Sequence, residues 1–365
     1  MLSLPAFGIS VTLRISALTP TNQRVLPNRN DPPETMMRVA ITGGSGFIGT
    51  NLIEHYVASS VPVVNLDPSQ PRNPQHVGHW RKVDPLDAND VREALGEFAP
   101  THVFHLGART DLHGTTLDDY AYNTRGVEVV LDACNGLAGL QRVVFASSRL
   151  VCRIGYQPVS DTDYCAPNAY GESKVRGEQI VRGAKTTFPW VIMRPTSIWG
   201  PWFDIPYRTF FLTIATNRYV HVGRRPVRKS FGYVGNTVQQ LAAVAEASSL
   251  EIDGTTMYLA DYPPIDVIDM ANRIQREFGS RPIRTLPRSV VKPGALVGDL
   301  LQKLGWTEPP LTSFRLDNLL TEMIYDTAPL SQIVPRLRYS LDESIRCTVD
   351  WMRSQELVGS QTPGP

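Results

Sequence analysis

Apolar and polar residues follow two alternating patterns between residues 38 and 195. Short apolar runs predict buried strands at Val39–Thr42, Val61–Leu66, His102–Leu106, Arg142–Ser147 and Trp190–Arg194. Apolar residues at helical spacing predict helices between them, at Asn51–Ala58, Asp90–Phe98, Asn123–Asn135 and Tyr170–Arg182. Strands that alternate with helices in this way predict an α/β fold, with a doubly wound parallel sheet covered by helices on both faces.

The regular alternation ends after Arg194, where prolines become frequent. Thr256–Leu259 predicts a strand that returns to the main sheet, and Thr237–Ala247 predicts a helix. Further helices are predicted at Ile265–Phe278, Ser313–Tyr325 and Ser340–Arg353. We therefore expect a smaller C-terminal α/β lid beside the main sheet.

A glycine-rich turn joins the first predicted strand to the first helix. Gly43 permits a sharp turn, Gly46 lets the backbone approach a pyrophosphate, and Gly49 lets the helix pack closely on the strand. The first amides of such a helix bind phosphate. The second strand leads into Asp67, whose carboxylate suits the ribose hydroxyls of NAD and would repel the 2′-phosphate of NADP. The strand before the turn and the helix after it favour a Rossmann-type dinucleotide site over a glycine-rich surface loop.

These patterns predict a division of the chain. We expect a cofactor-binding domain at 37–198 to which 233–261 returns, a substrate lid built from 199–232 and 262–353, and a flexible tail at 354–365. Residues 1–36 resemble either a transit peptide or a start placed too far upstream. Met36 and Met37 lie directly before the first strand, which favours the second interpretation and a poorly ordered leader.

Composition excludes several classes of function. Hydrophobic residues make up 42% of the chain and the formal net charge is +1, as in an ordinary soluble globular protein. Without a basic excess or a long apolar run, we expect neither nucleic acid nor a membrane as partner. The four cysteines lack metal-ligand spacing, so we expect free thiols in the cytoplasm and no metal site.

Three residues form a candidate catalytic group. Tyr170 and Lys174 lie one turn apart on a predicted helix, and Ser148 follows a predicted strand. A tyrosine is a poor base at neutral pH, so we expect the Lys174 ammonium to lower its pKa. Ser148 would hold the substrate oxygen while Tyr170 transfers its proton. A Tyr/Lys pair alone is common on helix surfaces, but the serine and the glycine turn occur in the order that the fold requires.

The chain resembles extended short-chain dehydrogenases/reductases of the NAD-dependent epimerase/dehydratase family. The similarity runs from Arg38 to about Trp351 and includes the motifs Thr42–Gly49, Phe104–Ala108, Asn123, Ser147-Ser148, Tyr170/Lys174 and Arg194–Pro201. The resemblance implies that Asp84 contacts adenine near Pro85 and that the Pro195–Ile198 segment lies against nicotinamide and substrate. The expected cofactor contacts are Gly43, Ser45, Gly46, Phe47, Ile48, Gly49, Asp67, Asp84, Pro85, Leu106, Gly107, Ala108, Asn123, Tyr170, Lys174, Pro195 and Ile198.

The chain departs from this family where the substrate binds. Members that act on nucleotide sugars usually carry Asn where this chain has Ser197, and the usual Val-Tyr-Gly is Val151-Cys152-Arg153. Dehydratases carry an Asp-Glu pair where this chain has Arg149-Leu150. Without those two acids, elimination of water lacks its proton donor and base, which argues against a 4,6-dehydratase.

Further substrate contacts are predicted around the catalytic group, each with an alternative. Arg149 suits a carboxylate or phosphate, or it is a surface arginine. Asp111, beside Thr110, orients a sugar hydroxyl or caps a turn. Arg228 or Lys229 binds a nucleotide diphosphate, or both belong to a solvated basic loop.

The leading hypothesis is an NAD-dependent epimerase or oxidoreductase of a nucleotide-linked sugar. The alternative is an oxidoreductase of a hydrophobic alcohol, similar to 3β-hydroxysteroid dehydrogenases, because the sequence of Tyr233–Asn236 is close to the matching motif of that branch. A non-catalytic dinucleotide-binding redox sensor ranks last, since such relatives commonly lose the Tyr/Lys pair. The resemblance also implies a homodimer formed through the predicted helices Asn123–Asn135 and Tyr170–Arg182.

Overall fold

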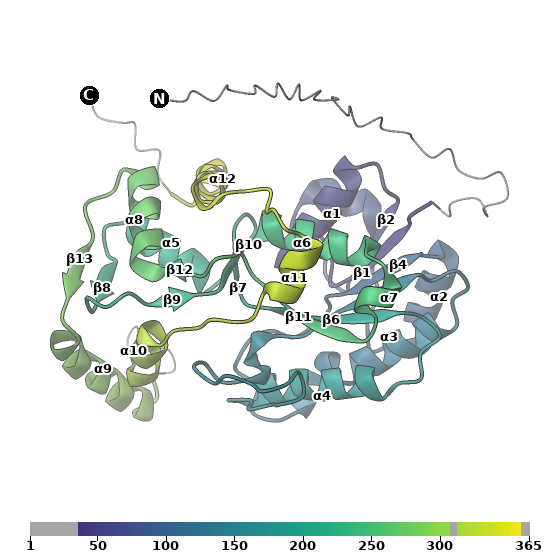
Figure 1. Cartoon of the computed structure of the whole chain (residues 1–365), viewed down its shortest axis with the longest axis horizontal. Coiled ribbons are helices and arrows are strands. Elements are labelled where there is room, and N and C mark those ends of the chain that lie inside the picture. The colour runs from purple at the N-terminus through teal and green to yellow at the C-terminus, as the bar shows by residue number, and fades with distance from the viewer. Residues whose placement is uncertain (1–35, 307–311, 359–365) are drawn as a thin grey trace, which may run out of the picture. The chain divides into compact units, whose positions relative to one another are not determined.

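The computed structural model describes residues 36–306 and 312–358 and confirms the predicted α/β fold (Figure 1). The strands of its central sheet are β1 (Val39–Thr42), β2 (Val63–Leu66), β3 (Trp80–Arg81), β4 (His102–His105), β5 (Arg142–Ala146), β6 (Trp190–Pro195) and β11 (Thr255–Leu259). They form one seven-stranded sheet in the order β11-β6-β5-β4-β1-β2-β3, and every neighbouring pair is parallel. The strand order reverses between β1 and β4, which is where ligands bind in such sheets.

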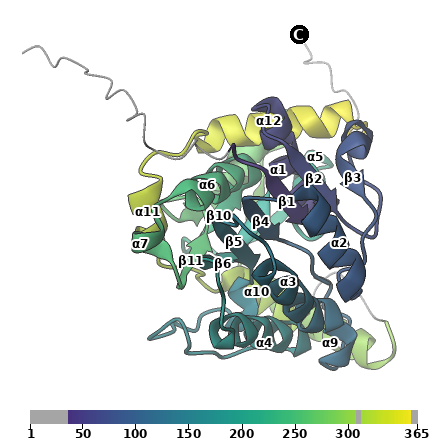
Figure 2. The same cartoon turned by 90° about the vertical axis from the view of Figure 1, so that its right-hand side faces the viewer.

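Helices cover both faces of this sheet (Figure 2). One face carries α1 (Phe47–Ala58), α6 (Val234–Glu246) and α11 (Ala328–Ile333), whose apolar side chains pack on β1, β6 and β11. The other face carries α2 (Ala88–Phe98), α3 (Arg125–Asn135) and α4 (Ala169–Gly183). The strands are buried on both sides, which explains why they read as continuous apolar runs without alternation.

The remaining segments form three two-stranded sheets and a second group of helices. The strand pairs are β7 (Ser197–Trp199) with β10 (Phe231–Tyr233), β9 (Arg228–Lys229) with β12 (Ile265–Asp266), and β8 (Val220–Val222) with β13 (Arg284–Leu286). The helices are α5 (Tyr207–Ala215), α8 (Val267–Phe278), α9 (Arg288–Lys303), α10 (Ser313–Leu320) and α12 (Leu341–Ser354). The short helix α7 (Ser249–Ile252) belongs to the main sheet, because Ile252 packs in its core. The 3₁₀ turns are η1 (Pro74–His79), η2 (Asp118–Asn123) and η3 (Arg149–Val151). A separate apolar core that includes Trp199, Phe211 and Ile274 joins α5, α8 and α12.

The prediction for this second group is incomplete, because α5 and the three strand pairs were not predicted, and two later helices also differ from it. The helix predicted at Ser313–Tyr325 ends at Leu320, because the chain then extends and Met323 pairs with Lys229 of β9. Helix α9 was not predicted, since Pro293 lies inside it and many of its apolar side chains are exposed. The predictions for the leader at 1–35 and for the last tail residues, 359–365, lie outside the described residues.

Asp261 lies just after β11 and connects that strand to β10. Its backbone N–H donates to the Phe231 carbonyl at 2.8 Å, and its carboxylate accepts the Tyr233 N–H at 3.1 Å. Burial raises the pKa of this carboxyl from 3.8 to about 7. The folded state therefore favours the protonated form more than the unfolded chain does, and each pKa unit of this difference is worth about 1.4 kcal/mol.

We expect the contribution of Asp261 to the free energy of unfolding to fall as the pH rises from 3.8 through about 7, the range in which the unfolded chain ionises Asp261 more readily. Asp261→Asn should remove this dependence and stabilise the protein above pH 7 relative to wild type. Urea unfolding across this pH range tests the expectation, with the exposed Asp118→Asn as control. A variant with the same pH profile as wild type would show that Asp261 does not titrate in this way.

Candidate active site

The glycine turn between β1 and α1 has the close contacts that the sequence predicts. Gly43 has a φ of +72°, and a Cβ there would lie 2.5 Å from the Gly107 nitrogen. A Cβ on Gly49 would lie 2.4 Å from the Gly43 carbonyl oxygen. By contrast, a Cβ on Gly46 would meet only that same oxygen, at 3.1 Å, so this side of the turn is open. The turn leaves room at Gly46 and closes tightly on both sides of it.

The surroundings of this turn fit a dinucleotide. Helix α1 begins at Phe47 without a side-chain cap among the described residues, so its first amides are free to bind an anion. Asp67 is buried after β2, and its two carboxylate oxygens each accept one backbone N–H, from Ser69 at 2.8 Å and from Ser45 at 3.2 Å. A carboxylate can accept more hydrogen bonds than these two, so Asp67 retains capacity for ribose hydroxyls. Burial raises the pKa of Asp67, while those two hydrogen bonds and the charge of Arg72 oppose the change.

Other predicted cofactor contacts lie along the same edge of the sheet. Leu106, Gly107 and Ala108 follow β4, where the Leu106 N–H donates to the Thr42 carbonyl at 3.0 Å. Pro195 ends β6 and Ile198 is buried in β7. Asp84 and Pro85 lie after β3, and Tyr122 forms a hydrogen bond with the Asp84 carboxylate. The Ser45 hydroxyl, also a predicted contact, donates to the Ser69 carbonyl at 2.8 Å.

The three predicted catalytic residues lie together at the carboxyl end of β5. Ser148 caps η3, and its Oγ accepts the Leu150 N–H at 3.1 Å. The same hydroxyl lies close enough to Tyr170, in the first turn of α4, to act on the pKa of its phenol. One turn further on, the Lys174 ammonium donates to the Ala146 carbonyl at 3.1 Å. The structure therefore places a hydroxyl, a phenol and an ammonium side by side.

The pKa of Tyr170 differs from the prediction. Burial raises the pKa of the phenol, and the groups that act against this change are the Ser148 hydroxyl and the Arg149 guanidinium. The expectation that Lys174 lowers the Tyr170 pKa is therefore wrong for this structure. Burial also lowers the pKa of Lys174 to about 8, against the opposing charge of Glu178. Tyr170 is a protonated phenol at neutral pH, in the form that donates a proton.

A buried ion pair beneath this group was missed by sequence reasoning. Glu178 accepts two hydrogen bonds from Arg194, at 2.8 and 2.7 Å, and both side chains are 1% exposed. It also accepts the hydroxyls of Ser147, at 2.5 Å, and Tyr164, at 3.0 Å. Glu178 follows Lys174 by one turn on the same helix face, and that spacing was the available signal. The network connects α4 to the ends of β5 and β6, so it positions the elements that carry the catalytic residues.

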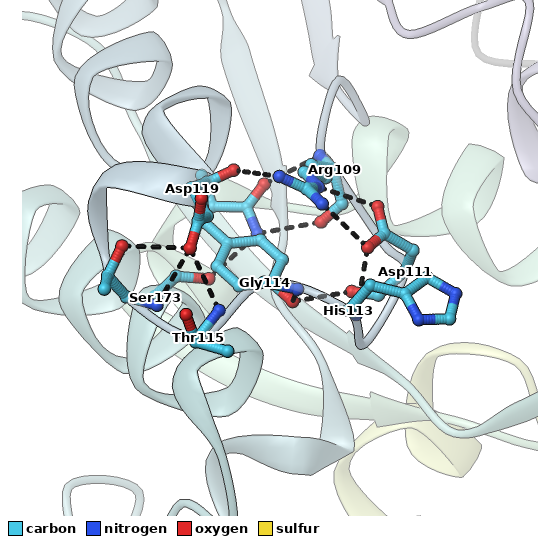
Figure 3. Close-up of polar contacts among 10 residues, drawn as sticks. Arg109, Asp111, His113, Gly114, Thr115, Asp119 and Ser173 are labelled. Carbon is cyan, nitrogen blue, oxygen red and sulfur yellow. Dashed lines mark hydrogen bonds and ion pairs between the residues drawn. The ribbon is translucent and has the colours of Figure 1, made fainter. Parts of the chain in front are cut away.

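Asn123 and Asp111 organise the loop that follows β4, in which Arg109, Asp111 and His113 lie close together (Figure 3). The Asn123 amide exchanges hydrogen bonds with the backbone of Arg109, at 2.9 and 3.0 Å, and donates to the Ser173 hydroxyl at 2.9 Å. Asp111 pairs with the Arg109 guanidinium at 2.7 and 3.0 Å and accepts the His113 N–H at 3.0 Å. These bonds support the turn-capping alternative for Asp111, while Thr110 is exposed beside it. Asn123 holds this loop against α4, and its contact with the cofactor stays a prediction.

The predicted substrate residues fall into two groups. Arg149 lies beside the catalytic residues, because its charge acts on the pKa values of both Tyr170 and Tyr325. Lys229 is buried, and its ammonium donates to the Asn318 carbonyl at 2.6 Å. Arg228 instead points to the surface, where it pairs with Glu322 at 3.2 Å. Neighbouring residues of a strand face opposite sides, so β9 separates the two basic residues.

Ser197 is buried, unlike the accessible side chain expected of a residue that binds the substrate. It is 2% exposed, and its hydroxyl lies 3.9 Å from the Met323 sulfur. The segment from Met323 to Tyr325 also contacts Ser230, since the Ser230 N–H donates to the Met323 carbonyl and the Tyr325 N–H donates to the Ser230 hydroxyl. Met323 and Tyr325 thus bring the chain after α10 to the site, a contact that the predicted longer helix did not anticipate.

Comparison with known proteins gives matches over most of the chain. The profile of the NAD dependent epimerase/dehydratase family matches residues 39–256. A 3 beta-hydroxysteroid dehydrogenase/Delta 5-->4-isomerase of Mycobacterium tuberculosis is 31% identical over 67% of this chain and 70% of its own length. An undecaprenol-linked N-acetylglucosamine 4-epimerase of Escherichia coli O157:H7 is 25% identical, over 86% of this chain and 94% of its own length. Among solved structures, the UDP-glucose 4-epimerase of Thermus thermophilus with NAD superposes with a TM-score of 0.64, at 22% identity over 87% of this chain and 99% of that one.

Proposed function

Because the chain belongs to the NAD dependent epimerase/dehydratase family, we propose that Ser148, Tyr170 and Lys174 catalyse the oxidation or reduction of a secondary alcohol carbon. The protein is an enzyme, and NAD is its cofactor. The observation that carries the catalytic assignment is the proximity of the Ser148 hydroxyl to the buried Tyr170 phenol, with Lys174 buried one turn along the same helix.

The geometry assigns a separate task to each of the three side chains. NAD, when bound, supplies the two-electron acceptor or donor. Ser148 holds the substrate oxygen, and Tyr170 gives its phenolic proton to that oxygen in reduction or receives it in oxidation. Lys174 carries a positive charge below its pKa of about 8 and would donate to the nicotinamide ribose, while Ser148 and Arg149 are the groups that favour the phenolate as the proton leaves. The network at Glu178 fixes α4 against β5 and so keeps Tyr170 within reach of Ser148.

The glycine turn and Asp67 would hold NAD. The open side of Gly46 and the first amides of α1 suit a pyrophosphate, and the Asp67 carboxylate suits the ribose hydroxyls. Arg72 lies near Asp67, and its guanidinium is engaged with the Ser45 carbonyl of the glycine turn at 3.2 Å, the Trp202 carbonyl at 3.0 Å and Asp204 at 2.5 Å. The pocket beside Asp67 therefore favours a hydroxyl over a phosphate at the ribose.

For the substrate, we favour the hydrophobic alcohol over the nucleotide-linked sugar. The 31% identical relative is named as a steroid dehydrogenase. Ser197 is buried against Met323, and Arg228 is paired with Glu322, so two of the residues expected to hold a nucleotide diphosphate are directed elsewhere. The nucleotide sugar remains the second candidate, because Lys229 is buried near Arg149 and can hold an anion.

A substrate panel tests this proposal. The intact protein with NAD is mixed with a 3β-hydroxysteroid, a long-chain secondary alcohol and UDP-glucose, and absorbance is followed at the reduced-nicotinamide band. A steady rise with a hydrophobic alcohol is the expected result. Conversion of the sugar without net absorbance change would indicate an epimerase instead. No conversion of any alcohol or sugar would contradict the proposed activity.

The assembly and location of the protein are also proposals. We infer a homodimer formed through α3 and α4, which pack side by side, and a cytoplasmic location. Within the described ranges, no helix combines the length and apolarity needed to cross a bilayer. Light scattering at several protein concentrations tests the dimer.

A further inference from the structure

Two cysteines are paired between the segments that carry Ser148 and Tyr170. Cys152 and Cys165 are partners in a parallel β-bridge, and both are free thiols in the structure. Two backbone hydrogen bonds flank the pair, because the Cys165 N–H donates to the Val151 carbonyl at 2.9 Å and the Arg153 N–H donates to the Cys165 carbonyl at 2.7 Å. The pair is therefore bonded like neighbouring residues of a parallel sheet.

The spacing of paired strands suits a disulfide. Neighbouring strands lie about 4.7–4.9 Å apart, and the Cα atoms of disulfide-bonded cysteines are usually about 4.4–6.8 Å apart. Residues paired directly across two strands also have their side chains on the same face. Cys152 and Cys165 can thus be joined without a large movement of either backbone.

The two thiols share the same surroundings. The Cys152 Sγ donates to the Asp163 carbonyl at 3.3 Å, so it extends over the segment that leads to Cys165. Burial raises the pKa of the Cys152 thiol, and the charge of Cys165 adds to the rise. The hydrogen bond with Asp163 raises the pKa of the Tyr156 phenol, and both thiols add to that rise. Both sulfur atoms therefore lie near one phenol and near one another.

The buried network at Glu178 holds the segment before Cys165 in position. The Asp161 carbonyl accepts a hydrogen bond from the Arg194 guanidinium at 2.6 Å, and the Tyr164 hydroxyl donates to Glu178 at 3.0 Å. Cys165 follows Tyr164 directly, so its backbone is fixed beside Cys152. Reacting groups that are held in place react much faster than the same groups free in solution.

The two thiols differ in their access to solvent. Cys152 is 0% exposed, whereas Cys165 is partly exposed, so an oxidant from solution reaches Cys165 first. The other two cysteines lie elsewhere, Cys134 buried on α3 and Cys347 on α12. In the part of the chain that the structure describes, no β-bridge joins either of them to another cysteine.

We infer that Cys152 and Cys165 form an oxidation site, at which hydrogen peroxide converts the two thiols into an intramolecular disulfide. The Cys165 thiolate attacks one peroxide oxygen and the O–O bond breaks, which leaves a sulfenic acid and, with the proton from the thiol, one water. The Cys152 sulfur then attacks the Cys165 sulfur and the S–O bond breaks. The leaving hydroxide takes the Cys152 proton and forms a second water. The two thiols lose two electrons in total, and the peroxide gains them.

The bond joins the two segments that carry the candidate catalytic group. Ser148 caps the turn η3, which ends next to Cys152, and Tyr170 lies in the first turn of α4, shortly after Cys165. Oxidation at this site therefore ties η3 to the segment that leads into α4. Disulfides in reducing compartments are usually transient, so the bond is expected to be reversible by a thiol reductant. The site goes beyond the proposed activity and does not depend on it.

Peptide mapping of the intact protein tests this oxidation site. Trypsin cleaves after Arg149, Arg153 and Lys174, so the two cysteines fall on different peptides that only a disulfide can hold together. The reduced protein is treated with hydrogen peroxide, digested without reductant and analysed by mass spectrometry. The expected result is a linked pair of peptides that dithiothreitol separates, with two of the four cysteines lost to thiol titration in urea.

Urea unfolding of the oxidised and the reduced protein gives a second measurement. A disulfide that closes the loop between Cys152 and Cys165 without strain should raise the urea midpoint by about 1 M. Cys165→Ser and Cys165→Ala should both lose the linked peptides and this shift, while Cys347→Ser, at a partly exposed cysteine of α12, should keep them. Absence of the linked peptides from wild type, a linkage to Cys134 or Cys347 instead, or a midpoint that does not rise would overturn the inference.

Discussion

Tyr170→Phe should lower turnover by about 10²- to 10⁴-fold, the range expected for loss of a general acid or base. Phenylalanine keeps the ring, which packs edge-on against Tyr120 with centroids 5.8 Å apart, and removes only the hydroxyl that lies near Ser148. The glycine turn and Asp67 are untouched, so NAD should bind with unchanged affinity. Turnover is measured with the best alcohol of the substrate panel, and NAD affinity by titration.

Tyr219→Phe provides the matched control for this variant. Tyr219 belongs to the lid segments, and its hydroxyl lies 3.2 Å from the His221 Nδ1. Its removal should leave turnover within the error of the assay. Full activity in Tyr170→Phe would rule out the proton transfer assigned to Tyr170, and equal losses in both variants would indicate a general effect on folding.

Glu178→Gln should destabilise the protein by about 3–5 kcal/mol, as expected when one partner of a buried ion pair is removed. The substitution preserves the shape of the side chain but leaves the Arg194 guanidinium, 1% exposed, without its negative partner. The hydroxyls of Ser147 and Tyr164 also lose a charged acceptor. Urea unfolding at neutral pH measures the change.

Glu172→Gln is the control on the same helix, because Glu172 is exposed and surface substitutions usually change stability by less than about 0.5 kcal/mol. A paired variant, Glu178→Leu with Arg194→Met, should recover much of the lost stability, since a buried ion pair can be replaced by apolar groups of similar size. Equal stability of Glu178→Gln and Glu172→Gln would show that the buried pair contributes little.

The main sheet could be predicted from the sequence because its signals are local. The apolar run at Val39–Thr42, the glycines that follow it and the helix after them are contiguous, and each has a direct physical role. Ser148, Tyr170 and Lys174 were found for a related reason. Parallel strands end at one edge of a sheet, so residues just after strands meet there even when they are far apart in sequence.

The electrostatics of the site could not be predicted in the same way. The Tyr/Lys spacing suggests a lowered pKa for Tyr170, but burial has the larger effect and raises it. How deeply a phenol is buried depends on the packing of β5, η3 and α4 together, which spacing along the chain does not contain. For the same reason the sequence alone does not reveal that Glu178 is buried against Arg194.

The substrate side was the least predictable part. Arg228 and Lys229 are adjacent in sequence and formed one basic cluster in the prediction, yet the short strand β9 turns one outward and the other inward. The approach of Met323 and Tyr325 to the site depends on the chain after α10, where the predicted helix was too long. Contacts of this kind join segments far apart in sequence and leave no local pattern.

The most direct test of the NAD site is a calorimetric titration of the purified protein with NAD and with NADP. Saturable binding of NAD, with much weaker binding of NADP, is predicted because Asp67 accepts ribose hydroxyls and repels a phosphate. Gly49→Ala should abolish the NAD signal, since its Cβ would lie 2.4 Å from the Gly43 carbonyl oxygen, whereas Gly96→Ala, in open space on α2, should keep it. Binding of neither dinucleotide, or tighter binding of NADP than of NAD, would contradict the account given for this site.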